Sequence, residues 1–280
     1  MDRSLLAAQI AKRLEQDRAA LKVEFRRPGR IRTAVVDGLL DEEVANQIYG
    51  AFPPVGDMMH RKSIREDKYV AAQMDRYHPL LEEALFAFQE PAVVAAVGDI
   101  AGIDPLLPDE HLYAGGISAM TRGQYLNPHI DNSHDGQLEH YRVLNLLYYT
   151  TPGWEPACGG HLQVWDRGLH HPARTLHSSF NRLVVMATST RSWHGVSEIV
   201  RDGVRTCVSN YYFSPRPVGP DGAPAPGDYY HVTTFRGFPG QPARNALLVA
   251  DGTLRAGVRK VVKRGLVPTK QVYRHPDSPA

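Results

Sequence analysis

Cysteine is scarce in this chain of 280 residues, which contains only Cys158 and Cys207. Two cysteines cannot build the framework of several disulfides that stabilises small secreted domains. Both are therefore interpreted as inert small side chains. The scarcity of cysteine predicts a protein of the reducing cytoplasm.

Long apolar runs are also missing, and no stretch approaches the roughly 20 consecutive apolar residues that a membrane-spanning helix needs. Charged residues interrupt the N-terminal segment MDRSLLAAQIAKRLEQDRAA, so no secretory signal peptide is predicted. Hydrophobic residues make up 42% of the chain and charged residues 22%, which is typical of soluble globular proteins. The composition therefore predicts a globular protein with no membrane span.

The net charge is only +2, but it is unevenly distributed. The last thirty residues hold an excess of basic side chains, with Arg255, Arg259, Lys260, Lys263, Arg264, Lys270 and Arg274 against Asp251 and Asp277. Such an excess is typical of a solvated basic face on a terminal helix. It also fits a contact for an anionic substrate or a nucleic acid.

The first part of the chain has the apolar periodicity of helices. The segments expected to be helical are residues 3–19, 41–52, 78–89 and 90–102. In the first segment Leu6, Ile10 and Leu14 recur at helical spacing, and in the last Pro91 stands near the first turn, where proline is favoured. A short strand is expected over residues 32–40.

From about residue 110 the pattern changes to short β-rich runs separated by Gly, Pro, Asn and Asp. Many short strands at such spacing predict an antiparallel sandwich or barrel. Residues 215–228 form a Pro/Gly-rich loop, which is interpreted as a lid or a mobile connection.

A last helix is expected to start after Asp251 and to end at Gly265. The apolar residues that share one of its faces are Leu254, Val258, Val261 and Val262. We predict a single domain over residues 1–280. Its parts are a helical N-terminal support over residues 1–109, a β-core over 110–215 and a C-terminal extension over 216–280.

The sequence His129-Ile130-Asp131 places an imidazole and a carboxylate two residues apart. On an extended strand, residues two apart point to the same face. Two imidazoles and one carboxylate are the ligand set of a non-haem Fe(II) centre with open coordination positions, and His194 is the candidate for the second imidazole. Arg205 follows it and is placed to grip the far carboxylate of a dicarboxylic cosubstrate bidentately.

Six segments place this motif in a known context. They are HIDN (129–132), LLYYTTPGW (146–154), GGHLQVW (159–165), FNRLVVM (180–186), WHGV (193–196) and VRTCVSNYYF (204–213). In order and spacing, residues 113–213 resemble the catalytic core of the 2-oxoglutarate/Fe(II)-dependent dioxygenases, in the prolyl 4-hydroxylase-like branch. The resemblance implies a mostly β fold with flanking α-helices around a double-stranded β-helix, the jelly roll of cupin type. Residues 110–215 would then be the jelly-roll catalytic core of a single dioxygenase domain.

The resemblance implies that His129, Asp131 and His194 hold Fe(II), and that Arg205 binds the 5-carboxylate of 2-oxoglutarate. In such enzymes the 2-oxo acid and dioxygen take the open positions, succinate and CO2 are released, and a C–H bond of the substrate is oxidised. Halogenating relatives replace the ligand carboxylate with Gly or Ala, so Asp131 argues against halogenation.

Further cosubstrate contacts follow from the same resemblance. Tyr149 matches a tyrosine that hydrogen-bonds 2-oxoglutarate in relatives, although plain packing in the barrel explains it nearly as well. Asn145 and Leu147 share its strand face and should also point into the barrel. Relatives often carry another tyrosine on the strand before the His-x-Asp motif. This chain has Met120 there, so one hydrogen bond is missing or Tyr125 supplies it from a different angle.

Other polar side chains invite functional interpretations. Arg122, Arg142, His231 and Arg236 are candidates for gripping substrate, although such arginines are more often merely solvated.

The remaining histidines near the motif are interpreted differently, because the iron ligand set is already complete. His134 and His140 are expected in a loop at the mouth of the site. His161 is read as structural or substrate-facing and not as an iron ligand.

The leading functional hypothesis is an oxygenase that hydroxylates an unactivated C–H bond of a small molecule, such as an amino acid, a sugar derivative or a biosynthetic intermediate. The alternative is a peptidyl or protein hydroxylase of prolyl type, because a fold does not fix a substrate. An open groove would favour the peptide, and a closed pocket with convergent polar groups would favour the small molecule.

Two further hypotheses rank lower. Nucleic-acid demethylases of this superfamily carry a second arginine six residues after the cosubstrate arginine, whereas this chain has Tyr211 there. A non-catalytic jelly-roll binding protein is disfavoured because all three candidate iron ligands are present.

Overall fold

The computed structural model describes residues 1–219, 229–261 and 273–274. The N-terminal helices are α1 (Arg3–Gln16), α2 (Arg18–Phe25), α3 (Glu42–Gly50), α4 (Pro79–Ala87) and α5 (Pro91–Ala101). Short 3-10 turns lie at Val55–Asp57, Met74–Arg76 and Pro156–Cys158.

Local sequence explains where the first helix begins and which face it buries. The side chain of Asp2 accepts a hydrogen bond from the Leu5 amide and so caps the N-terminus of α1. Leu6, Ile10 and Leu14 recur at helical spacing and are fully buried, as the sequence predicts.

The strands of the described part of the chain form one antiparallel sheet. They are β1 (Thr33–Asp37), β2 (Met59–Lys62), β3 (Glu66–Ala71), β4 (Leu107–Pro108), β5 (Gly116–Thr121), β6 (Tyr125–Ile130), β7 (Tyr141–Tyr149), β8 (Leu162–Val164), β9 (Arg174–Leu176), β10 (Arg182–Ala187), β11 (His194–Val196), β12 (Val204–Ser214) and β13 (Thr234–Phe235). Their order is β1-β10-β7-β12-β5-β3-β6-β11-β8-β9, with β2 beside β3, β4 beside β12 and β13 beside β6. The mostly β fold with flanking helices is therefore confirmed.

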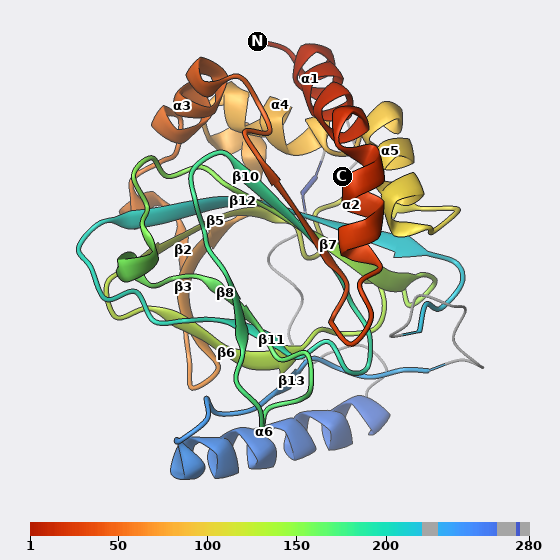
Figure 1. The fold of residues 1–280 in the computed structure, drawn as a ribbon. Coiled ribbons are helices and arrows are strands. Elements are labelled where there is room, and N and C mark those ends of the chain that lie inside the picture. Colours follow the sequence, from red (N-terminus) through yellow and green to blue (C-terminus); the bar gives the residue numbers. More distant parts are fainter. Residues whose placement is uncertain (220–228, 262–272, 275–280) are drawn as a thin grey trace.

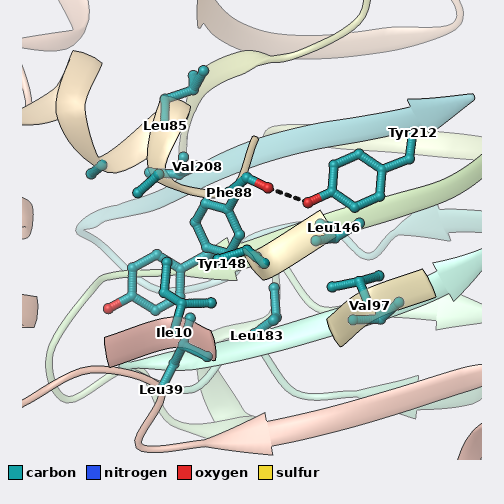
Figure 2. Close-up of a cluster of buried hydrophobic side chains, with 14 of the residues drawn as sticks. Ile10, Leu39, Leu85, Phe88, Val97, Leu146, Tyr148, Leu183, Val208 and Tyr212 are labelled. Carbon is teal, nitrogen blue, oxygen red and sulfur yellow. Dashed lines mark hydrogen bonds between the residues drawn. The ribbon is translucent and has the colours of Figure 1, made fainter. Parts of the chain in front are cut away.

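The sheet curls so that two sets of strands face each other across a central space (Figure 1). The β10-β7-β12-β5 set is covered on its outer side by α1, α3, α4 and α5, whereas α6 (Pro242–Val261) lies at the opposite end beside β13. Figure 2 shows part of the core between helices and sheet, where Phe88 lies beside Tyr148 and the same cluster includes Val97 and Leu183. The hydroxyl of Tyr212 donates a hydrogen bond to the Phe88 carbonyl oxygen there. Burial of this apolar layer is the main stabilising contribution to the fold.

Two features of the N-terminal and C-terminal segments depart from the expected elements. The strand expected over residues 32–40 is confirmed as β1, but residues 1–109 also supply β2 to β4, and β3 lies between β5 and β6. The hairpin of β2 and β3 was missed because its sequence, MHRKSIREDKYVA, is too polar for a typical strand.

The expected start of the last helix after Asp251 is wrong, since α6 already begins at Pro242, a favoured first position. Leu254 and Val258 do share a face, but that face is exposed. The expected end at Gly265 and most of the Pro/Gly-rich loop, residues 220–228, lie outside the described residues.

No single helix among the described residues is long and apolar enough to cross a bilayer, although α4 and α5 together, bent at their junction, meet that length and composition.

Replacing Leu146 with alanine should lower the free energy of unfolding by about 2–5 kcal/mol, because it leaves a cavity in the core between helices and sheet. Leu247→Ala on α6 is the matched control, since Leu247 is 60% exposed and its truncation should change the value by less than about 0.5 kcal/mol. Urea denaturation followed by circular dichroism measures both, and equal effects would contradict the core position of Leu146.

Candidate metal and cosubstrate site

Two histidines from different strands meet at one point inside the barrel. His129 on β6 is the direct cross-strand partner of His194 on β11, and their ring centroids lie 4.1 Å apart. The strands approach closely because Gly195 follows His194, and a Cβ at Gly195 would lie 2.8 Å from the Leu126 carbonyl oxygen. Antiparallel pairing thus brings together two imidazoles that are distant in the sequence.

Asp131 completes the cluster. Its Oδ1 lies 3.5 Å from Nε2 of His129 and its Oδ2 lies 3.4 Å from Nε2 of His194. All three side chains are buried, and their candidate ligand atoms lie within 4.8 Å of one another. His129 and Asp131 therefore point to the same side, as residues two apart on an extended strand do.

Backbone carbonyls fix the orientation of both imidazoles. Nδ1 of His129 lies 3.0 Å from the Asn127 carbonyl oxygen, and Nδ1 of His194 lies 2.8 Å from that of Ser192. Because a carbonyl only accepts, Nδ1 carries the proton in each ring and the lone pair of Nε2 points to the shared centre. Burial, reinforced by the neighbouring His129, lowers the pKa of His194 to about 4, so this ring is neutral at physiological pH.

Two residues contact the same oxygen of the Asp131 carboxylate. Asn145 Nδ2 donates to Oδ2 at 2.8 Å, and the guanidinium of Arg142 lies 3.4 Å from the same oxygen. Arg142 also donates through Nε and NH2 to Asn145 Oδ1. Burial alone would raise the pKa of Asp131, but the positive charge of Arg142 holds it well below its usual range. The carboxylate is thus ionised, with Oδ1 on the side of the His129 imidazole.

This donor set fits a divalent transition metal. Two imidazole nitrogens and one carboxylate oxygen, all on one side of a common point, are the facial arrangement that suits non-haem Fe(II) and leaves coordination positions open. Hydrogen bonds already orient all three ligands, as supporting residues do in metal sites.

Across the cavity, Arg205 and Tyr149 offer polar atoms without partners. The side chain of Arg205 is buried, and its Nη2 lies 2.9 Å from the Met120 sulfur. Its Nε has no hydrogen-bond partner. The hydroxyl of Tyr149 is equally buried and unpartnered, and burial raises the pKa of this hydroxyl, so it remains a donor. Unsatisfied buried donors are costly, so this pair fits the carboxylate of a bound ligand.

The side chains of Arg205 and Tyr149 line a cavity of about 330 Å³. Its walls carry the three candidate ligands and Arg205, together with Asn145, Leu147 and Tyr149 from β7 and Met120, Cys207, Ser209 and Tyr211 from β5 and β12. The structure thus brings together most of the residues that the sequence singles out.

Tyr125 is not part of this lining. The guanidinium of Arg244 lies 4.7 Å from its ring centroid, which places Tyr125 against α6. Met120 occupies the wall beside Arg205 instead. Asn145 does line the cavity, but its side-chain amide donates to Asp131, so it contacts the candidate metal ligand and not the space left for a cosubstrate.

Of the four substrate candidates, Arg142 alone lies in the cavity wall. Arg122 is exposed and pairs with Asp202, and the guanidinium of Arg236 lies over the Trp193 ring. The backbone amide of His231 donates to the Ser133 hydroxyl.

The other histidines also lie outside the cavity lining. His134 packs on Tyr141, and His140 bonds to Asp135 in the loop that follows the motif. His161 accepts from the Ser178 amide through Nδ1 and bonds to the Pro156 carbonyl oxygen, which is a structural role.

The sequence did not reveal several residues of the cavity wall. Arg61, Arg65 and Lys68 come from the overlooked hairpin, and Phe235 on β13 stacks on His129 with ring centroids 5.2 Å apart. The alternation of Glu66 and Lys68 on one side of the hairpin was the available signal.

Replacing Asn145 with leucine should weaken anaerobic Fe(II) binding by about 10–100-fold, because Asp131 loses the amide that orients it. Isothermal titration of the purified protein measures this affinity. Asn132→Leu is the control, because Asn132 contacts Arg142 at 3.2 Å but donates nothing to Asp131. An Asn145→Leu protein that folds and binds Fe(II) as tightly as the unaltered protein would contradict the supporting role.

Comparison with known sequences identifies the core of this chain. Residues 115–213 match the family model of the 2OG-Fe(II) oxygenase superfamily. A mouse protein named prolyl 3-hydroxylase OGFOD1 is 32% identical over 87 residues, which are 29% of this chain and 16% of that protein. The chain therefore spans about a sixth of the length of this curated relative.

Solved structures share the fold. A prolyl hydroxylase from Trichoplax adhaerens, in complex with a peptide of the hypoxia inducible factor oxygen degradation domain, has a TM-score of 0.53 at 17% identity, covering 71% of this chain and 91% of that one. A prolyl-4-hydroxylase from Pseudomonas putida has a TM-score of 0.52 at 13% identity, covering 69% and 98%. The double-stranded β-helix expected from the sequence is thereby confirmed.

Proposed function

This chain belongs, through residues 115–213, to the 2OG-Fe(II) oxygenase superfamily, and we propose that it hydroxylates an unactivated C–H bond of a small molecule. The superfamily uses Fe(II), 2-oxoglutarate and dioxygen. The observation that carries the proposal is the buried cluster of His129, Asp131 and His194 across the cavity from the unpartnered Nε of Arg205.

Each residue of the cluster has a defined task in this proposal. His129 and His194 present Nε2 lone pairs, and Asp131 presents Oδ1, while Arg142 and Asn145 hold the carboxylate in place. With Fe(II), 2-oxoglutarate and dioxygen bound, the centre supplies oxidative decarboxylation to succinate and CO2, coupled to oxidation of a substrate C–H bond.

Arg205 and Tyr149 bind the cosubstrate. The planar guanidinium of Arg205 binds the 5-carboxylate through two parallel N–H···O hydrogen bonds. The Tyr149 hydroxyl donates a hydrogen bond to the same ligand. Two buried polar groups that lack partners thereby gain them, so the ordered site is stabilised when the cosubstrate is present.

The dimensions of the cavity favour a small substrate. Its volume of about 330 Å³ is at the lower end of the range for small-molecule pockets and must also hold the cosubstrate. Thr233 and Phe235 of the β13 region, together with Arg255 of α6, form part of its wall. A polypeptide groove would need an open surface beside the metal.

A peptidyl or protein hydroxylase is the second candidate. It is favoured by the sequence similarity of the core to the mouse protein named as a prolyl 3-hydroxylase. Succinate release stimulated by proline-rich peptides, and not by small metabolites, would select this candidate.

Replacing Arg205 with methionine should raise the 2-oxoglutarate concentration for half-maximal succinate release by about 10–100-fold, the effect of losing charge-assisted hydrogen bonds. Fe(II) binding should be unchanged, since Arg205 is not a candidate ligand. Succinate release with Fe(II), 2-oxoglutarate and dioxygen measures the first quantity, and metal titration measures the second.

Arg122→Met is the matched control, because the Arg122 side chain is 66% exposed and lies outside the cavity lining. It should leave the 2-oxoglutarate requirement unchanged. Identical requirements in the Arg205 and Arg122 variants would remove the cosubstrate role of Arg205.

A further inference from the structure

The wall of the cavity is strongly basic. Its charged residues are Arg61, Arg65, Lys68, Arg142, Arg205 and Arg255 against Glu66 and Asp131. A partly enclosed cavity lined mainly by one sign of charge focuses the field and concentrates ligands of the opposite sign.

The neighbouring carboxylates do not cancel this charge. Glu66 is shared by Lys68, 2.9 Å away, and Arg61, 3.8 Å away. Burial would raise the pKa of Glu66, but Lys68 and Arg61 hold it below its usual range, so the group is ionised. Two cations and one carboxylate leave this cluster with a net positive charge.

A second acid is shared by two basic residues in the same way. Asp251 of α6 accepts bidentate hydrogen bonds from Arg65. It also pairs with Arg255, whose Nε lies 3.1 Å from Oδ2. Fe(II) and the 2-oxoglutarate dianion carry opposite charges of equal size, so their binding leaves the excess of positive charge in place.

A side branch of about 80 Å³ adjoins the main cavity between β3, β5 and β12. It combines the two cations, Arg61 and Lys68, with the side chains of Ser118, Ser209 and Tyr211. Burial raises the pKa of Tyr211 to about 12, so its hydroxyl remains a donor at physiological pH. These five residues, the basic branch, present ammonium, guanidinium and hydroxyl groups to one small space.

The basic branch is separate from the Arg205 end of the cavity. Arg205, Cys207, Ser209 and Tyr211 alternate along the inner face of β12, so Tyr211 lies about 20 Å along the strand from Arg205. Tyr211 pairs in register with Asn145, the residue that orients Asp131. An occupant of the branch therefore lies beside the metal cluster, where a substrate is expected.

We propose that the substrate is a small anionic molecule whose phosphate or carboxylate group binds in the basic branch, with Lys68 as a specificity-determining residue. This inference rests on the proposed function and deepens it by naming the substrate class. The anionic group anchors the molecule at one end and leaves its remaining carbon skeleton beside the metal cluster. Ammonium and guanidinium donors bind phosphate and carboxylate oxygens through charge-assisted hydrogen bonds.

The test compares simple probes on the anaerobic protein loaded with Fe(II) and 2-oxoglutarate, which does not turn over without dioxygen. Phenyl phosphate and benzoate should bind at least about tenfold more tightly than benzyl alcohol, and benzylamine should bind weakest. Rising salt should weaken the two anions selectively. The ratio between phenyl phosphate and benzoate tells which anion the branch prefers, and equal affinities for anionic and neutral probes would overturn the proposal.

A pair of lysines from one hairpin provides the variant and its control. Lys68→Met should weaken binding of the preferred anion by about tenfold or more, whereas Lys62→Met should leave it within about twofold, since the Lys62 side chain is 72% exposed. Both variants lose the same charge, so general electrostatics cannot explain a difference. Equal effects, or a Lys68→Met protein that loses 2-oxoglutarate affinity instead of probe affinity, would overturn the assignment.

Failure of this inference is distinguishable from failure of the proposed function. If Fe(II) and 2-oxoglutarate do not bind together, the proposed function fails, and the same probe titrations on the metal-free protein still test the basic branch. Tight, Lys68-dependent binding of an acidic peptide without binding of either small anion would replace the small molecule with a peptide and overturn the proposal.

Discussion

The antiparallel pairing of β6 with β11 is the constraint on which the site depends. It sets His129 directly opposite His194, and the absence of a side chain at Gly195 lets the two strands approach closely enough. Asp131 follows on the same face because residues two apart on a strand point the same way. The carbonyls of Asn127 and Ser192 then orient both rings. Strand geometry alone therefore gathers the three candidate ligand atoms.

Charge organises the rest of the cavity. Arg142 lies against Asp131 and over the Tyr211 ring, 3.8 Å from its centroid, and thereby keeps a buried carboxylate ionised. Arg205 has no carboxylate partner among the described residues and lies within reach of a ligand that brings one. Glu66 and Asp251 each form ion pairs with two basic side chains. The candidate metal ligands, the proposed cosubstrate arginine and the proposed basic branch thus form successive parts of one cavity, and each part carries charges suited to a different ligand.

The sequence predicted the β-core and the candidate ligands because both follow from local rules. Period 2 placed His129 and Asp131 on one face, and the order of the motifs indicated His194 and Arg205. The same rules could not place Arg142, since a strand arginine looks solvated until its buried partner Asn145 is known. They also missed the hairpin of β2 and β3, because it is polar and is held by tertiary contacts such as Arg65 with Asp251. The true start of α6 at Pro242, a favoured first position, was missed as well.

The most direct test of the account is an anaerobic titration of the purified protein with Fe(II) and then 2-oxoglutarate, followed by visible absorption. We expect a weak band that appears only when both are present, because 2-oxoglutarate would bind to a metal that His129, Asp131 and His194 would hold. Asp131→Ala, which removes the carboxylate ligand, should abolish the band. A protein that retains no iron and shows no band, or an Asp131→Ala variant that shows the full band, would contradict the central claim that these three residues form the metal centre.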